Sequence, residues 1–239
     1  MTRSSIGRFS GVLALAGVAA LVTSCGHAPF THGANALDPA IAVPDSFVVA
    51  FETSRGRIDI MAHTAWSPAG VDRFYTLVRE HYYDGARFFR VVKNFVAQFG
   101  ISGDPALNRA WRVRRLADDP VKHSNTRGTI SYARGGAGTR TVQLYINLKD
   151  NARLDSLNGF GFPPIAEVVS GMDVVDSLYS GYGESTPRSG PTAGHSGPSQ
   201  DSIQIAGNKY LERGWPKLDY IKSARVVREW RSPARGEIE

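Results

Sequence analysis

Two polar side chains stand inside an otherwise apolar run and could do chemistry together. The run FFRVVKNFVAQFG, residues 88–100, carries Arg90 and Gln98 among phenylalanine and valine. A guanidinium and an amide can both donate hydrogen bonds, and such bonds are stronger where little water competes. The run predicts strand structure but follows no single clean alternation, so the local sequence leaves open whether Arg90 points into solvent or into a site.

Other chemistries lack their residue patterns. The six histidines do not have metal-ligand spacing, and the GGAG stretch at residues 135–138 lacks the Lys-Ser/Thr of a phosphate-binding loop. No Gly-x-Ser-x-Gly elbow is present for a serine nucleophile. We therefore expect neither a metal nor a cofactor. The histidines are His27, His32, His63, His81, His123 and His195.

Composition favours one folded, soluble-type domain. The chain has 239 residues, of which 42% are hydrophobic and 10% aromatic, enough for a packed core. The formal net charge is +6, but the basic residues are spread along the chain rather than clustered. We therefore expect no nucleic-acid partner.

The N-terminus has the pattern of an export signal. Residues 1–24 place two arginines before an apolar run that is too short to cross a membrane as a helix. The following VTSC, residues 22–25, resembles a bacterial lipobox, in which the cysteine is lipidated and becomes the new N-terminus. Cys25 is the only cysteine, so it has no disulfide partner in the chain. We expect a lipid-anchored protein that faces the periplasm, and Gly26 favours the outer membrane; the alternative is a plain signal peptide with an incidental cysteine.

The remaining chain predicts a tether, one domain and a tail. Residues 25–45 are rich in Gly, Ala and Pro and predict a flexible tether, the domain is expected at residues 46–228, and residues 229–239 form a charged tail. A hairpin is predicted within residues 46–63, turning at Ser54-Arg55-Gly56, and a helix follows Ser67-Pro68. Further strands are predicted at residues 87–92, 94–100, 128–134, 142–148, 165–169 and 220–227, helices at 172–179 and 201–213, and a loop at 181–200. This inventory favours a mostly β fold, a closed eight-stranded antiparallel barrel with two or three flanking helices.

Three blocks in order resemble the cyclophilin peptidyl-prolyl isomerases. Residues 88–100 match the family pattern F-H-R-V-x-x-x-F-x-x-Q-x-G at Arg90, Phe95, Gln98 and Gly100. GTISYA at residues 128–133, followed by QLYI at 143–146, resembles the second block, and AEVVSGMDVVDSL at 166–178 resembles a later one. The resemblance covers about residues 46–178, and it implies a prolyl isomerase that needs no cofactor.

The resemblance also implies site residues. Arg90 would stabilise the twisted prolyl amide, and Gln98 would orient the substrate backbone. The remaining substrate-binding residues implied by the match are Phe95, Tyr132, Ala133, Arg134, Gln143, Tyr145, Leu154 and Phe162.

Four positions depart from the family pattern. Phe89 stands where most cyclophilins have histidine, Arg134 where asparagine is common, Arg153 where many carry tryptophan, and Phe162 near the place of a pocket histidine. These departures concern pocket polarity and substrate range, and loss of the tryptophan implies weaker cyclosporin binding.

Two functions follow from these expectations. The first is a monomeric prolyl isomerase that acts on proline-containing segments of exported proteins. The alternative is a non-catalytic module on the membrane that binds proline-containing peptides as a scaffold. Retention of both Arg90 and Gln98 favours the enzyme.

Overall fold

The computed structural model describes residues 42–184 and 197–232. The predicted signal segment, Cys25 and almost all of the predicted tether lie outside the described residues. So do the middle of the loop predicted at residues 181–200 and most of the predicted tail. The account below concerns the described residues alone.

The first two strands form the predicted hairpin. Strand β1 (Ser46–Thr53) pairs antiparallel with β2 (Arg57–His63), with Val49 opposite Ile60. Gly56 makes the turn with a φ of 137°, which a side chain would disfavour. Alternate residues of both strands are fully buried, so the period-two hydrophobic pattern placed one face of the hairpin on the core.

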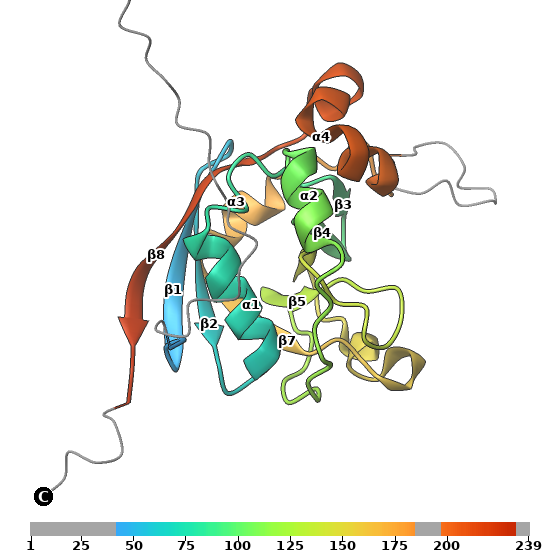
Figure 1. Cartoon of the computed structure of the whole chain (residues 1–239). Coiled ribbons are helices and arrows are strands. Elements are labelled where there is room, and N and C mark those ends of the chain that lie inside the picture. The colour runs from blue at the N-terminus through green and yellow to red at the C-terminus, as the bar shows by residue number, and fades with distance from the viewer. Residues whose placement is uncertain (1–41, 185–196, 233–239) are drawn as a thin grey trace, which may run out of the picture. The chain divides into compact units, whose positions relative to one another are not determined.

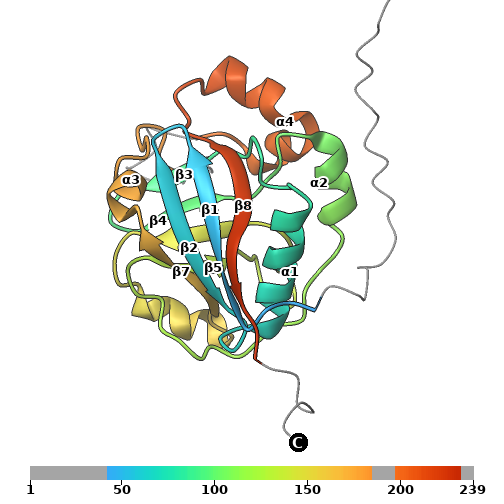
Figure 2. The same cartoon turned by 90° about the vertical axis from the view of Figure 1, so that its left-hand side faces the viewer.

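The sheet has eight strands in the order β3-β4-β6-β5-β7-β2-β1-β8, and all its recorded pairs are antiparallel. Figures 1 and 2 show β7, β2, β1 and β8 side by side. The mostly β, eight-stranded antiparallel fold is thus confirmed. The other bounds are β3 (Arg90–Val92), β4 (Val96–Phe99), β5 (Thr129–Tyr132), β6 (Leu144–Asn147), β7 (Pro164–Ser170) and β8 (Ile221–Trp230).

The chain segments just before the edge strands β3 and β8 lie side by side. An isolated antiparallel bridge joins Arg87 to Tyr220, and the backbone N–H of Phe88 donates to the carbonyl of Asp219 over 2.9 Å. No β3–β8 ladder is recorded among the described residues, so closure into a barrel stays a prediction. Strand β8 runs to Trp230, three residues beyond the expected end at 227, because Trp230 still pairs with Ser46 of β1.

Helix α1 (Pro68–Arg79) begins where Ser67-Pro68 predicts. Its buried residues, among them Val71, Phe74 and Val78, pack into the main core beside strands β2, β7 and β8. The apolar stripe at helical spacing therefore identified the correct face.

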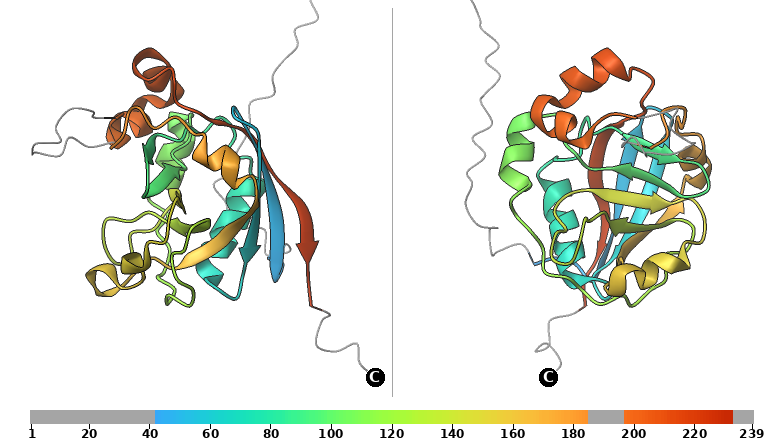
Figure 3. Two further views of the ribbon diagram at one scale, coloured as in Figure 1. Left: turned by 180° about the vertical axis from the view of Figure 1, so that it is seen from behind. Right: turned by 90° about the vertical axis from the view of Figure 1, so that its right-hand side faces the viewer.

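Four α-helices are described rather than the two or three expected. Helix α2 (Pro105–Trp111) was not predicted, although Asp104-Pro105 is a good start signal and the Asp104 side chain accepts from Ala106 N. Helix α3 (Met172–Asp176) is shorter than expected, and α4 (Gln200–Gly214) is interrupted at Gly207. Figure 3 shows α4 beside α2 at one end of the sheet. Ile203 and Leu211 of α4 are buried in one cluster with Phe89.

Candidate active site

The β3–β4 hairpin brings the two polar residues of the opening run together. Arg90 and Gln98 are direct partners across it, and Nη1 of Arg90 donates to Oε1 of Gln98 over 3.1 Å. Asn94 turns the chain with a φ of 57°, a conformation that asparagine tolerates better than most residues. The Arg90 side chain is only 17% exposed. It therefore does not project freely into solvent, which settles the orientation that the local sequence left open.

Gln98 is held by the neighbouring strand. Its Nε2 donates to Oε1 of Gln143 over 2.9 Å, and its backbone lies opposite Tyr145 of β6. An amide nitrogen carries two hydrogens, so a second one remains for a ligand. Arg90, Gln98 and Gln143 therefore form a connected row of hydrogen-bonding side chains.

A cavity of about 500 Å³ lies against this row. Its polar lining includes Arg90, Gln98, Gln143, Arg134, Arg153 and Glu184. Its apolar lining includes Phe95, Val96, Ala133, Tyr145, Leu154 and Phe162. All the expected site residues except Tyr132 thus lie around one cavity.

The apolar lining is a small core of its own. Val96, Tyr145 and Leu154 are buried together, with Phe95, Ala133, Leu157 and Phe162 packed around them. Leu154 comes from a short 3-10 helix, Ala152–Asp155, and its carbonyl accepts from the backbone N–H of Phe162 over 2.9 Å. This wall offers a compact apolar surface beside the polar row, which suits a ligand with one small apolar ring and one amide.

Tyr145 contributes its ring rather than its hydroxyl. Burial raises its pKa well above the ordinary value of 10.0, so the phenol stays protonated. The hydroxyl donates to Oδ1 of Asn125 over 3.1 Å, and Asn125 also accepts from Ser131 over 2.9 Å. These bonds fix the ring, which lies 6.1 Å from that of Phe162 between centroids.

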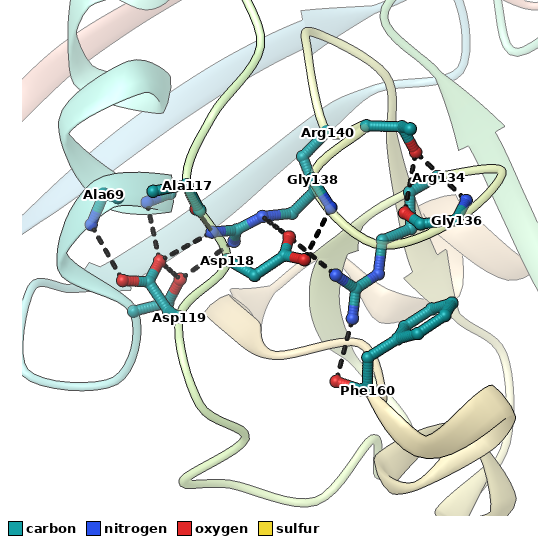
Figure 4. Close-up of polar contacts among 12 residues, drawn as sticks. Ala69, Ala117, Asp118, Asp119, Arg134, Gly136, Gly138, Arg140 and Phe160 are labelled. Carbon is teal, nitrogen blue, oxygen red and sulfur yellow. Dashed lines mark hydrogen bonds and ion pairs between the residues drawn. The ribbon is translucent and has the colours of Figure 1, made fainter.

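Arg134 forms a neutralised part of the wall. Its side chain is fully buried, its Nη1 lies 2.7 Å from the carboxylate of Asp118, and its Nη2 donates to the carbonyl of Phe160 over 2.9 Å (Figure 4). The guanidinium covers the Phe160 ring at 4.2 Å and the Phe162 ring at 5.2 Å from their centroids. Burial lowers the pKa of Arg134, and Asp118 opposes that effect. Arg134 therefore shapes the cavity through Phe162.

A second buried arginine supports this wall from behind. Arg140 is fully buried and lies beside both Asp118 and Asp119, with its Nη2 3.0 Å from the Asp119 carboxylate (Figure 4). Asp119 also accepts from the Ser67 hydroxyl and the Gly70 N–H, at the start of α1. Burial raises the pKa of Asp119, but these hydrogen bonds and Arg140 together hold it below its ordinary value of 3.8. The network ties the loop before β5 to helix α1.

The partner that lies nearest to Arg90 could not be predicted from the sequence. Glu184 lies 94 positions further along, yet its Oε2 accepts from Nε of Arg90 over 2.6 Å and its Oε1 from Nη2 over 2.8 Å. This is a two-point pairing between a planar fork and a carboxylate. No motif predicts it, because the contact depends on how the chain after α3 folds back over β3.

Two residues of the family blocks lie away from the cavity. Tyr132 is buried in the main core, and its hydroxyl donates to the carbonyl of Gly70 over 3.0 Å. Successive residues of a strand face opposite sides, and Tyr132 faces the core behind Ala133. Tyr132 therefore does not line the cavity, in contrast to the role that the resemblance implies. Phe89, at the family's histidine position, is likewise buried, in the cluster beneath α4.

Arg153 lies at the family's tryptophan position and at the mouth of the cavity. Its guanidinium carbon is 5.4 Å from the centroid of the Phe95 ring, the same distance as that of Arg90. Phe95 is therefore flanked by two arginines, of which Arg90 is partly buried and Arg153 exposed.

The described residues contain neither a candidate metal site nor a candidate membrane span. The described part of the chain holds no cluster of three or more His, Cys, Asp or Glu side chains suited to a metal ion. Across residues 42–184 and 197–232, no helix combines the length and apolar character needed to span a bilayer.

Comparison with known proteins places this site in a family. A sequence model of the family described as "Cyclophilin type peptidyl-prolyl cis-trans isomerase/CLD" matches residues 48–207. The chain is 36% identical over 154 residues to peptidyl-prolyl cis-trans isomerase B of Escherichia coli, an alignment that covers 60% of this chain and 88% of that protein. It is 35% identical over 147 residues to peptidyl-prolyl cis-trans isomerase A of Dickeya dadantii, which covers 60% of this chain and 76% of that protein.

The fold gives the same result. A crystal structure of a Cryptosporidium parvum cyclophilin-type peptidyl-prolyl cis-trans isomerase superposes with a TM-score of 0.52 and 17% sequence identity, and covers 76% of this chain and 98% of that one. At this identity the likeness concerns the fold alone. Because the family match extends over most of the sequence and the named relatives are aligned over most of their own length, the chain belongs to the cyclophilin-type peptidyl-prolyl cis-trans isomerases and is an isomerase enzyme.

Proposed function

We propose that Arg90 accelerates X-Pro rotation by donating a hydrogen bond to the prolyl nitrogen in the twisted state. Rotation breaks amide conjugation and meets a barrier of about 18–20 kcal/mol. In the twisted state the nitrogen lone pair is no longer shared with the carbonyl, so it becomes a better acceptor. A donor that meets this lone pair binds the twisted state more tightly than either planar isomer, and this lowers the barrier.

The surroundings of Arg90 support this role. Glu184 and Gln98 receive three of its hydrogen bonds, whereas a guanidinium has five N–H groups. The Arg90 guanidinium lies 5.4 Å from the centroid of the Phe95 ring, so a proline ring resting on Phe95 would be within its reach. This juxtaposition of an oriented donor and an apolar ring surface is the observation that carries the proposal.

The remaining cavity residues would bind and orient the peptide. Phe95, Leu154 and Phe162 offer the apolar surface for the proline ring, above the ring of Tyr145. Gln98 would hydrogen-bond the substrate backbone, while Ala133 and Gln143 line the path of the flanking residues.

We also propose that the sheet closes into a barrel where Arg87 meets Tyr220. Arg87 lies three residues before β3, the edge strand that carries Arg90. Closure there would restrict the motion of the β3 backbone and hold the arginine at the cavity.

The proposed clients are proline-containing segments of exported proteins. This part of the proposal rests on the signal-like residues 1–24 and the lipobox-like sequence that ends at Cys25. Replacing Cys25 by serine should prevent labelling with palmitate and release the protein from membrane fractions. Equal labelling of both forms would remove Cys25 as the anchor.

The direct test of activity is cis-trans exchange in a short Ala-Pro peptide, measured by NMR without a coupled protease. We expect the chain to increase the exchange rate of the X-Pro bond. A chain that binds the peptide but leaves the exchange rate unchanged would instead be a scaffold.

A further inference from the structure

A second hollow of about 560 Å³ adjoins the cavity around Phe95. The two spaces share Arg90, Phe95, Arg153 and Glu184, and the second adds Lys149 and Asn151. A peptide whose proline occupied the first space would therefore carry a flanking residue past the second. We call this second hollow the flanking groove.

The flanking groove has an excess of positive charge. Arg90, Lys149 and Arg153 line it, and among the described lining residues Glu184 alone is acidic and is bonded to Arg90. Lys149 and Arg153 are exposed, and neither forms an ion pair with another residue in the described ranges. Asp150, next to Lys149 in the chain, accepts from the backbone N–H of Arg127 over 2.8 Å.

Arg153 is placed to meet a residue next to the proline. Its exposed guanidinium lies over the Phe95 ring and lines the cavity. The side-chain amide nitrogen of Asn151 already donates two hydrogen bonds within the protein, one to the carbonyl of Phe95 and one to Asn147. Among the described lining residues, the cations that could contact a ligand without breaking an ion pair with another described residue are therefore Arg153 and Lys149.

Glu184 shows that a carboxylate can be accommodated here. Its two oxygens lie 2.6 and 2.8 Å from nitrogens of Arg90, and both residues line both hollows. A second carboxylate would be attracted by Arg153 and Lys149 and repelled by Glu184. Removing one of the two cations should therefore weaken the binding of a second carboxylate, whereas removing the Glu184 charge should strengthen it.

We infer that the flanking groove selects acidic side chains next to the proline, so that the preferred substrates are Glu-Pro, Asp-Pro, Pro-Glu or Pro-Asp segments. The inference rests on the proposed isomerase function and names its substrate class. Because Lys149 and Arg153 are exposed, the preference is modest, about two- to fivefold in kcat/KM for glutamate over glutamine, as for other exposed ion pairs. It decreases as salt screens the charges.

The experiment compares two pairs of capped peptides that differ only by Glu or Gln, placed directly before the proline in one pair and directly after it in the other. Exchange is measured by NMR at about 0.01 M and about 1 M salt, where the Debye length falls from about 30 Å to about 3 Å. The ratio of kcat/KM for Glu over Gln should reach about two or more in at least one pair at low salt and approach one at high salt.

The variants locate the preference. Arg153→Gln and Lys149→Gln should lower the ratio, and Glu184→Gln should raise it because a competing negative charge is removed. Arg109→Gln on α2 and Lys222→Gln on β8 make the same charge changes at exposed positions outside both hollows, and they should leave the ratio unchanged.

Two results would overturn the inference. One is a ratio near one in both pairs at low salt, and the other is an undiminished ratio in the Arg153→Gln/Lys149→Gln double variant. Turnover of the glutamine peptides tests the isomerase separately. If no peptide were turned over, the mechanism would fail, and dissociation constants of the same peptides from NMR titration would still decide whether the groove prefers acidic side chains.

Discussion

Replacing Arg90 by alanine should separate its effect on rate from its effect on stability. The side chain makes three hydrogen bonds, two to Glu184 and one to Gln98, and it is 17% exposed while that of Glu184 is 35% exposed. Partly exposed ion pairs contribute about 0–1 kcal/mol to folding. The variant should therefore unfold within a few degrees of the parent chain.

The effect on rate should be much larger. Loss of one oriented donor to a group that becomes an acceptor only in the transition state costs about 2.7–4 kcal/mol, or about 10²–10³ in kcat. Because the bond to the prolyl nitrogen is absent from both planar isomers, the dissociation constant of the peptide should change little. NMR exchange and titration with one Ala-Pro peptide measure both quantities.

Glu184 complicates this experiment and also provides its control. In the Arg90→Ala variant the Glu184 carboxylate loses two hydrogen bonds and could repel the substrate carbonyl. The Arg90→Ala/Glu184→Gln double variant removes that charge, and we expect most of the loss in rate to persist in it. Recovery of turnover in the double variant, or near-parental turnover in Arg90→Ala itself, would refute the arginine mechanism.

Three further predictions concern the fold. Arg140→Ala should lower the free energy of unfolding by about 2–5 kcal/mol in urea titrations, because it empties the space of a fully buried side chain and removes the cation paired with the partly buried Asp119. The pKa of Asp119 is lower in the folded chain than its ordinary value of 3.8. Its contribution to stability is therefore present above that value and is lost as the pH falls through the folded pKa. In melts between neutral and acid pH, the melting temperature should decrease less for Asp119→Asn than for the parent chain. Truncation after Gly197 removes α4 and β8 and should abolish cooperative melting by circular dichroism, whereas truncation after Ser232 should not; a normal melt of the shorter chain would show that β8 is dispensable.

The local residue pattern predicted those strands and helices whose formation depends mainly on neighbouring residues in the sequence. Alternation buried one face of the β1–β2 hairpin, and Ser67-Pro68 with an apolar stripe predicted the start of α1. Helix α2 was missed because it is short and has few apolar repeats, although Asp104-Pro105 marked its start. The break at Gly207 depends on its close approach to the Gly103 carbonyl, a tertiary contact that no local pattern contains.

Contacts between site residues could be predicted where a family motif sets their spacing in the sequence. They could not be predicted where they depend on how distant segments pack together. Arg90 and Gln98 lie in one hairpin, so their sequence separation determined their contact. The direction of Tyr132 required the register of β5, since a shift of one residue exchanges the core and cavity faces. Glu184 reaches Arg90 from a distant segment, and only the folded chain brings the two together.

The departures from the family pattern do not all have the same consequence. Arg134 and Phe162 act together, because the arginine covers the phenylalanine ring and is itself neutralised by Asp118. That pair can replace a more polar wall without adding free charge to the cavity. Arg153 also stacks on a ring, that of Phe95, but it forms no ion pair with another described residue and remains exposed. Its charge is therefore available to a ligand, so Arg153, rather than Arg134 or Phe162, is the departure through which substrate preference should differ from that of relatives with tryptophan at this position.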